Sequence, residues 1–342
     1  MEDKLNILVL AGGLSDERQV SLTSAEAIVT ALKNLGYGVN VLDTATGESL
    51  LDGNGKYLLE KDDKSISKIA FKQSESLVLS QAIKIEPYNN SDLVFIALHG
   101  GAGEDGTIQA LLDMAKIKYT GSNMISSAMA MNKSVAKKLI ENKKIPTPKY
   151  LLFNQDRESI KDQISNINDT FDFPLIVKPN NSGSTVGLTM VKGDEMLNDA
   201  IEAAYGVSPE VLVEQFIDGR EITSAVLDET SYPLVEIIPS GEIYDYTCKY
   251  TKGKSQYICP AELPKKTTEL IKDYGRHAYD ALKCSGLARV DFILDKDNIP
   301  WFLELNTLPG MTELSLAPMA AKEAGVDFEK LIQKICESVL KG

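Results

Sequence analysis

Short apolar runs alternate with segments of helical periodicity through the N-terminal third of the chain. Runs at 6–12, 37–43 and 92–98 have the length and the aliphatic content of buried strands. Residues 20–35 and 107–115 show the spacing of apolar positions that is typical of helices. The alternation of such strands with helices predicts a parallel sheet with covering helices.

The pattern changes beyond this region. A helix predicted over 125–142 ends before Pro146 and Pro148, which mark a probable linker between domains. Residues 51–59 resemble a small hairpin. The other expected elements are strands at 173–179, 187–192 and 210–217, a helix at 194–205, and short strands that alternate with helices near 264–284 and 317–340.

Composition places the chain among soluble globular proteins of several domains. Its 342 residues are more than a single domain with one hydrophobic core usually has. Its contents of 43% apolar and 25% charged residues are normal for soluble proteins. No apolar stretch approaches the ~20 residues that cross a bilayer, and the start of the chain is not that of a signal peptide. The cysteines lack C-x-x-C spacing, which predicts a reduced, cytoplasmic protein: Cys248, Cys259, Cys284 and Cys336.

The net charge of −13, without any basic block, argues against a nucleic-acid or anionic-membrane partner. A phosphate ligand would therefore depend on local lysines, backbone amides and metal ions.

The stretch FLELNTLPGM at 302–311 carries an acid and an amide inside an otherwise apolar strand. Regular alternation places Phe302, Glu304 and Asn306 on one face and Leu303 and Leu305 on the other. A strand whose polar face meets water is the simplest interpretation. Burial of the carboxylate instead requires a partner, and a cation is one such partner.

The preceding strand supplies further polar groups. If residues 295–298 form a turn, Arg289 lies opposite Glu304, and Asp291 and Asn306 lie on the same face of the hairpin. A slip of one residue in this register would separate the two acids. Carboxylate and amide oxygens are hard ligands that suit Mg²⁺ beside nucleotide phosphates, so the hairpin predicts a metal site.

Two segments have the character of a nucleotide site. The strand at 173–179 delivers Lys178, and the loop Ser182–Gly187 offers hydroxyls and unhindered amides that suit phosphates, although a mobile hairpin would have the same composition. In the segment 211–222, Glu214 and the backbone of 215–217 suit a purine, and Glu221 suits ribose hydroxyls. Taken alone, that segment also reads as an ordinary strand and turn.

Two shorter patterns are misleading. Residues 101–106 match G-x-G-x-x-G between a strand and a helix, with Asp43 as a possible ribose-binding acid. However, Glu104 and Asp105 would repel a pyrophosphate, and no acid follows at the required distance. A Gly-Lys-Ser at 253–255 lacks the first glycine of a P-loop, since Cys248 stands at that position.

Six motifs together resemble the D-alanine–D-alanine ligases of the ATP-grasp superfamily, over about Leu8 to Gly325. They are GGLSDERQVS, LHGGAGEDG, VKPNNSGSTVG, YDYTCKYTKGKSQYICPA, ARVDF and ELNTLPGMTELSLAP. The resemblance implies a three-domain α/β ATP-grasp fold with an N-terminal doubly wound parallel sheet. The implied domains are 1–121, 122–213 and 214–342, with a mobile loop at 244–262 that closes over the site.

The resemblance also implies a reaction. ATP phosphorylates the carboxylate of one D-alanine, and the amine of a second attacks the acyl phosphate, as in the synthesis of peptidoglycan precursors. Glu17 would bind the ammonium group of the first D-alanine and would be linked by hydrogen bonds through Ser184 to Tyr250, and His99 would line the same pocket. Alternatively, Glu17 and Ser21 would only cap a helix.

The other roles implied by the resemblance fall into four groups. Arg289 and the Gly310 amide would stabilise the tetrahedral oxyanion, and Ser315 and Leu316 would hold the second carboxylate. The ATP-binding residues would be Lys133, Lys178, Glu214, Gln215, Phe216, Ile217, Glu221 and Lys249. The ligands of two Mg²⁺ or Mn²⁺ ions would be Asp291, Glu304 and Asn306. Ser182 departs from the family pattern, which often has Glu there.

The second substrate stays open. D-lactate or D-serine ligases differ from D-alanine ligases mainly in the mobile loop, and the sequence YDYTCKY with Tyr250 resembles the dipeptide type. A nucleotide-binding module without catalysis is a third possibility, but a pure binder would need neither Glu17 nor Arg289. The resemblance also implies a homodimer.

Overall fold

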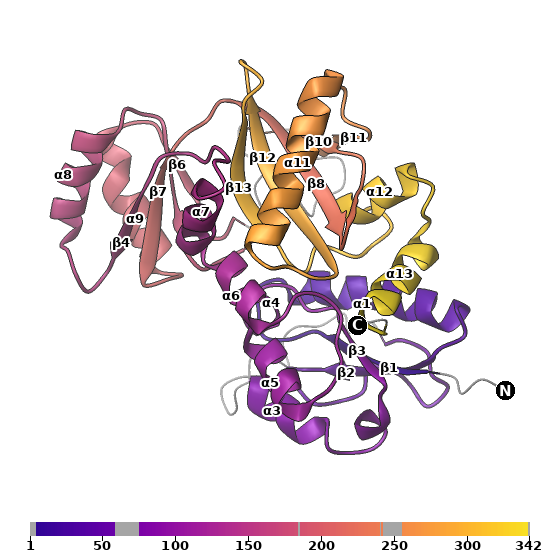
Figure 1. Cartoon of the computed structure of the whole chain (residues 1–342). Coiled ribbons are helices and arrows are strands. Elements are labelled where there is room, and N and C mark those ends of the chain that lie inside the picture. The colour runs from indigo at the N-terminus through magenta and orange to yellow at the C-terminus, as the bar shows by residue number, and fades with distance from the viewer. Residues whose placement is uncertain (1–4, 59–74, 184, 240, 242–254, 341–342) are drawn as a thin grey trace.

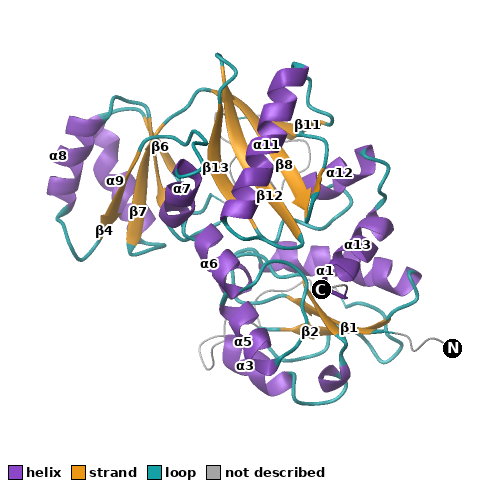
Figure 2. Cartoon of the chain, in the orientation of Figure 1, coloured by secondary structure: helices purple, strands orange, loops and turns teal. Residues whose placement is uncertain are grey.

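The computed structural model describes residues 5–58, 75–183, 185–239, 241 and 255–340. Its strands form three sheets, which lie at the bottom, at the left and at the top of the view in Figure 1. The secondary structure is mixed, with helices against each sheet (Figure 2). No helix among the described residues is long and apolar enough to cross a membrane.

The N-terminal sheet is parallel, as the alternating pattern predicts. It contains β1 (Asn6–Ala11), β2 (Gly38–Asp43) and β3 (Leu93–Ile96) in the order β2-β1-β3. Successive residues of β1 pack on opposite faces: Ile7 packs with helices α1 (Arg18–Asn34) and α13 (Phe328–Leu340), and Leu8 with α3 (Glu75–Ala82) and α5 (Thr107–Ala115). Burial on both faces explains why these strands are apolar throughout.

The second sheet is antiparallel, in the order β4-β7-β5-β6. Its strands are β4 (Tyr150–Asn154), β5 (Leu175–Pro179), β6 (Thr189–Val191) and β7 (Glu210–Gln215). Helices α8 (Ile160–Thr170) and α9 (Leu197–Tyr205) cover one face, where Val177 and Val213 are buried. Alternation therefore directs Lys178 and Glu214 to the opposite face.

The third sheet carries the predicted hairpin and has the order β11-β10-β8-β12-β13, with β9 paired to β8. Its strands are β8 (Gly219–Leu227), β9 (Thr230–Ser231), β10 (Val235–Pro239), β11 (Ser255–Ile258), β12 (Leu287–Asp295) and β13 (Pro300–Asn306). Helices α6 (Met124–Met131), α7 (Lys133–Glu141) and α11 (Lys265–Ala281) pack on one face and bury Phe292 and Phe302. On the opposite face, Ala225 and Leu227 pack in the core of the N-terminal sheet, and Glu221, Asp291 and Glu304 line a cavity.

Two predicted helices are each divided in the structure. The helix expected over 125–142 is α6 and α7, because the side chain of Asn132 accepts a hydrogen bond from the Val135 amide and starts a new helix. The segment 317–340 is α12 (Leu316–Glu323) and α13, separated at Gly325, whose φ of 78° is left-handed.

The domain boundaries stay a prediction. The expected boundary between residues 213 and 214 falls inside β7. Most of the expected loop at 244–262 lies outside the described residues, but its residues Ser255–Ile258 form β11 at the edge of the third sheet. These residues pair with β10.

Candidate active site

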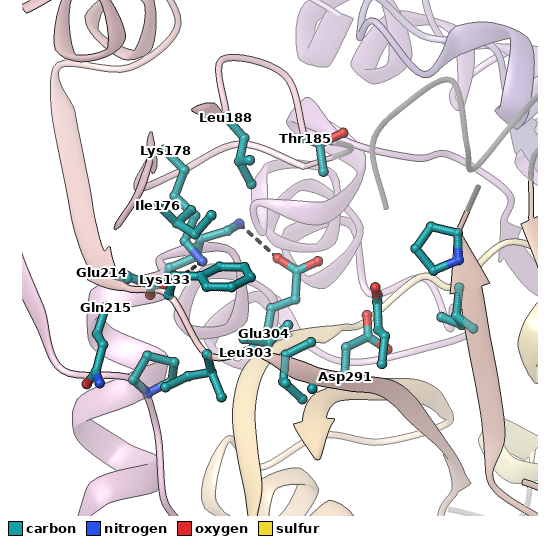
Figure 3. A pocket seen from close by; sticks show the side chains of 18 of the residues that line it. Lys133, Ile176, Lys178, Thr185, Leu188, Glu214, Gln215, Asp291, Leu303 and Glu304 are labelled. Carbon is teal, nitrogen blue, oxygen red and sulfur yellow. Dashed lines mark ion pairs between the residues drawn. The ribbon is translucent and has the colours of Figure 1, made fainter. Parts of the chain in front are cut away.

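A cavity of about 360 Å³ lies between the second and third sheets. This volume is in the range of small-molecule sites. Figure 3 shows Lys133 and Lys178 close to Glu214, with Glu304 and Asp291 farther along the cavity. The cavity brings together these predicted site residues: Lys133, Lys178, Glu214, Gln215, Phe216, Ile217, Glu221, Asp291 and Glu304.

Glu214 is a buried partner of lysines. Its Oε2 lies 2.7 Å from Lys178 Nζ and its Oε1 lies 2.8 Å from Lys137 Nζ. These two ammonium groups lower the pKa of Glu214, although its burial acts in the opposite direction. The side chain is thus a fixed anion that orients Lys178 at the rim of the cavity.

Lys133 links the phosphate loop to the acidic hairpin. Its Nζ donates a hydrogen bond to the Ser182 carbonyl (2.6 Å) and lies 3.2 Å from Glu304 Oε2. Lys133 begins α7, and Lys137 is one helical turn further along the same face. Two ammonium groups therefore reach the cavity region from one helix.

The 289–306 hairpin is antiparallel as predicted, but the predicted register is wrong. Asp291 lies opposite Glu304, and Arg289 lies opposite Asn306. The turn is one residue longer than expected, since Leu294 pairs with Pro300, and a bulge shifts the register again between Asp291 and Phe292. The four polar residues still share one face, because the second shift offsets the separation that the first would have caused.

The bulge also reverses the expected orientation of two apolar residues. Phe302 faces the core, where its ring meets Phe292 edge to face with 6.2 Å between the ring centroids. Leu303, which was expected to face away from Glu304, lines the cavity beside it (Figure 3). The extra residue in the bulge breaks strict alternation, and this gives the cavity an apolar surface next to an acid.

Asp291 is the centre of a dense polar network. It accepts hydrogen bonds from Arg289 (3.0 and 2.9 Å), Thr223 Oγ1 (2.6 Å) and Asn306 Nδ2 (3.0 Å). Within the described part of the chain, no group of three or more His, Cys, Asp and Glu side chains could hold a metal ion. The candidate donor set is therefore two carboxylates, Asp291 and Glu304, completed by the Asn306 amide. These hard oxygen donors suit Mg²⁺.

The loop that carries Gly310 is fixed by residues of the N-terminal region. Leu308 donates its amide to Glu104 Oε1 (3.2 Å) and offers its carbonyl to His99 Nδ1 (3.0 Å). Ser24 Oγ lies 3.0 Å from His99 Nε2 and accepts from the Met311 amide (3.3 Å). A carbonyl can only accept, so His99 carries a proton on Nδ1.

Burial determines the protonation of His99 and of Glu104. Burial lowers the pKa of His99 and so favours the neutral ring, whose Nε2 accepts from the Ser24 hydroxyl. Burial and the neighbouring Glu17 raise the pKa of Glu104 to about 8. Glu104 is a structural acid, because it accepts from the Gly100 amide (2.9 Å) and from the Leu308 amide.

Glu17 lies between the 99–101 turn and the phosphate loop. An added Cβ on Gly100 would be 2.6 Å from Glu17 Oε2, and one on Gly183 would be 3.1 Å from it. Ser15 accepts from the Glu17 amide (3.2 Å) and donates to the His99 carbonyl (2.5 Å). Both glycines thus leave room for a carboxylate beside the loop that lines the cavity.

The capping interpretation of Glu17 and Ser21 is wrong. The side chain of Glu17 makes no capping hydrogen bond to α1, and Ser21 accepts from the Gly12 amide (2.9 Å) and donates to the Ala97 carbonyl (2.7 Å). Asp43 does not face a ligand either, since Arg18 binds both of its oxygens (2.9 and 2.7 Å) in a buried pair.

Ser315 and Leu316 lie at the N-terminus of α12, where helix amides favour an anion. The Ser315 hydroxyl accepts from the Thr312 amide (3.1 Å). A Cβ on Gly310 would lie 3.0 Å from Ser315 Oγ, so the expected oxyanion loop and the expected carboxylate clasp are adjacent. Ser184, Lys249 and Tyr250 lie outside the described residues, and their roles stay predictions.

Sequence reasoning missed Lys137 and Thr223, and it did not identify the structural role of Glu104. Lys137 had one available signal, its i+4 spacing from Lys133 on a predicted helix. Thr223 faces Asp291 across two paired strands, a contact that no local pattern reveals.

Comparisons with known proteins agree with this geometry. The family model described as D-ala D-ala ligase N-terminus matches residues 6–122, and the model described as D-ala D-ala ligase C-terminus matches residues 139–337. The chain belongs to the D-alanine–D-alanine ligase family. A family member from Pelotomaculum thermopropionicum is 40% identical over 98% of this chain and 97% of its own.

Solved structures show the same fold. The D-alanine–D-alanine ligase from Bacillus anthracis complexed with ATP matches with a TM-score of 0.77 at 30% identity, over 98% of each chain. The VanG D-Ala:D-Ser ligase from Enterococcus faecalis matches with a TM-score of 0.78 at 29% identity, over 98% of this chain and 100% of its own. The predicted α/β ATP-grasp fold with an N-terminal parallel sheet is confirmed.

Proposed function

We propose that this protein is an ATP-dependent D-alanine–D-alanine ligase that makes D-alanyl-D-alanine for peptidoglycan precursors. The observation that carries the proposal is the position of Glu17. This candidate anchor for an amino-acid ammonium lies against Gly183, and Gly183 lines the cavity that holds the candidate phosphate lysines. An amino acid and a nucleotide phosphate would therefore meet at one loop.

The cavity suits ATP in one orientation. Gln215, Phe216 and Ile217 offer the backbone edge for adenine, with Ile176 and Leu303 as apolar walls, and Glu221 suits the ribose. Lys133 lies beside Glu304 of the hairpin and Lys178 beside Glu214, and both lysines line the cavity, where they would contact the phosphates. Lysine side chains serve here as point charges for phosphate oxygens.

Asp291, Glu304 and Asn306 would hold Mg²⁺ or Mn²⁺, and the fit rests on their hard oxygen donors. They share one face of the hairpin, and Asp291 and Glu304 both line the cavity. When bound, the ions would neutralise charge on the β- and γ-phosphates.

Family membership implies a reaction in two steps. A D-alanine carboxylate oxygen attacks the γ-phosphorus of ATP, which gives an acyl phosphate and ADP. The amine of the second D-alanine then attacks the acyl carbon, and phosphate leaves as the peptide bond forms. Arg289 and the Gly310 amide would donate to the oxyanion between these events, while α12 holds the second carboxylate. Family membership also supports a cytoplasmic homodimer with the domain division given above.

The test is a substrate panel of D-alanine, D-serine and D-lactate, each combined with D-alanine, ATP and Mg²⁺. Phosphate release and product mass are recorded. Dipeptide from D-alanine alone is the expected main product. A main product with D-serine or D-lactate would assign the neighbouring specificity, and no phosphate release with any mixture would indicate a nucleotide-binding protein without this activity.

Gly100→Ala is expected to raise the KM for D-alanine and to lower stability by about 1–3 kcal/mol. Gly100 has a φ of 64°, and the added methyl would push the Glu17 carboxylate away from its position. The matched control is Gly36→Ala, because Gly36 has a φ of 89° but no neighbour within 4 Å of the added carbon. Urea unfolding should show a loss in both variants, and only Gly100→Ala should change the KM. An equal KM in both would contradict the placement of Glu17.

A further inference from the structure

Lys137 is a buried cation that does not line the cavity. Its side chain is 0% exposed, and its Nζ lies 2.8 Å from Glu214 Oε1. Glu214 in turn holds Lys178, whose Nζ lies 2.7 Å from the other carboxylate oxygen. One anion is thus shared by two cations, and only Lys178 is at the cavity.

Lys137 also reaches the strand that bears the acids. Its Nζ donates to Thr147 Oγ1 (2.6 Å), and Thr147 Oγ1 donates to the Phe302 carbonyl (2.9 Å). The Phe302 amide donates to the Pro146 carbonyl (2.8 Å). Phe302 directly precedes the bulge at Leu303, so the chain of contacts joins β7 and β5 to the bulged part of β13.

The summed charge of Lys137, Glu214 and Lys178 determines how strongly this cluster attracts a phosphate. Lys178 and Glu214 alone would form a neutral pair, which would attract a phosphate only weakly. With Lys137 protonated, the three side chains carry one net positive charge in surroundings where screening is weak. Burial of a lysine ammonium group costs folding free energy, and such a cost beside a ligand cavity is typical of functional residues.

We propose that Lys137 is a positioning residue for the nucleotide: through Glu214 it leaves Lys178 with an unneutralised charge for the phosphates, and through Thr147 it sets the position of β13 relative to Lys178. The proposal rests on the ATP-dependent activity proposed above. It assigns Lys137 no contact with substrate.

The surroundings of Lys137 make its charge sensitive to pH. Burial lowers the pKa of Lys137 to about 8; Glu214 raises it, Lys178 lowers it, and Glu141 raises it. The ring of Tyr150 lies 5.4 Å from the Nζ and also favours the cation. The full positive charge is therefore present below pH 8 and is lost as the pH rises above it, so ATP affinity should fall in the same direction.

The first experiment measures the Kd of Mg-ATP by calorimetry for the full chain at pH 7. Lys137→Met is expected to weaken binding about 10- to 100-fold, the range found for groups that act through a neighbour. Lys138→Met is the control, because Lys138 is exposed one position further along α7. Equal affinities for the two variants would overturn the proposal.

The double variant Lys137→Met/Glu214→Gln separates the charge effect from a packing defect. Removing the anion together with its second cation restores one net positive charge at Lys178, so affinity should recover part of the loss, although Glu214 no longer orients Lys178. A double variant that binds as weakly as Lys137→Met, or more weakly, would show that Lys137 only supports the fold. If circular dichroism shows that Lys137→Met is poorly folded and the double variant is folded, the ATP Kd of the double variant is compared with that of the wild type instead.

Thr147→Val tests the second arm without changing charge. Loss of the two hydrogen bonds of the Thr147 hydroxyl, from Lys137 and to the Phe302 carbonyl, is expected to raise the Mg²⁺ concentration for half-maximal activity about two- to tenfold, with the ATP Kd nearly unchanged. An unchanged Mg²⁺ dependence would remove this arm of the proposal. The calorimetric Kd does not depend on the second substrate, so wild-type protein that binds ATP but makes no dipeptide would refute the proposed function and leave the binding tests of Lys137 intact.

Discussion

Glu304→Gln is expected to lower the rate of ligation by about two to three powers of ten, while the protein stays folded. The substitution removes one charge from the candidate metal site and no volume from the core, and loss of several kcal/mol of charge stabilisation gives a decrease of this size. The expected decrease is partly recovered by high Mg²⁺, because the weakened site still has Asp291 and Asn306. Initial rates over a Mg²⁺ series measure both effects.

The control for this variant is Asp297→Asn, an exposed acid in the turn of the same hairpin. It removes the same charge from the same element at a distance from the cavity, so its rate should be close to normal. Glu304 also pairs with Lys133 at 3.2 Å, and loss of that pair alone would not change the Mg²⁺ requirement. Near-normal ligation by folded Glu304→Gln at modest Mg²⁺ would show that the ligand assignment is wrong.

The N-terminal sheet was predictable because its information is local. Ile7 and Leu8 are buried on opposite faces of one parallel sheet, and a continuous apolar run is the direct consequence. The hairpin at 289–306 was also predictable, since a polar turn separates two apolar runs. Its polar face was identified from the two-residue period of a strand.

The register of that hairpin was not predictable in the same way. A bulge has no strong local signal here, and a single extra residue exchanges the faces of Phe302 and Leu303. The four polar residues were still placed together, although for a reason that the sequence did not contain. The longer turn and the bulge each shift the register by one residue, and the two shifts offset each other. Counting residues outward from the expected turn predicts neither shift.

The supporting groups of the site depend on tertiary contacts. Glu104 binds an amide at Leu308, and Lys137 contacts Glu214, so each partner is distant in the sequence. Burial decides their chemistry, since it raises the pKa of Glu104 to about 8 and lowers the pKa of Lys137 to about 8. The sequence showed an acid in a glycine-rich turn and a lysine on a helix, both of which are ordinary surface residues elsewhere.

Arg289→Met is expected to lower kcat about 100- to 1000-fold, because it removes a donor to the oxyanion of the ligation step. Arg289 lies opposite Asn306 and binds both oxygens of Asp291 at 3.0 and 2.9 Å, so it has a second possible role as a support for the metal site. The two roles predict different changes in Mg²⁺ dependence. If Arg289 acts at the oxyanion, its loss removes only a cation that competes for Asp291, and the Mg²⁺ requirement should stay the same or decrease. If Arg289 acts by holding Asp291 in place, the Mg²⁺ requirement should increase.

The measurement is therefore kcat over the same Mg²⁺ series used for Glu304→Gln, together with the Kd of ATP. Arg289→Lys serves as the matched variant: it keeps the charge but not the paired hydrogen bonds to Asp291, so an intermediate rate is expected. A higher Mg²⁺ requirement in Arg289→Met, parallel to that of Glu304→Gln, would mean that Arg289 acts by holding Asp291. A low kcat with ATP affinity and Mg²⁺ dependence preserved is the result that places the guanidinium at the oxyanion, because only a group that acts after nucleotide and metal are bound can change the rate and neither affinity.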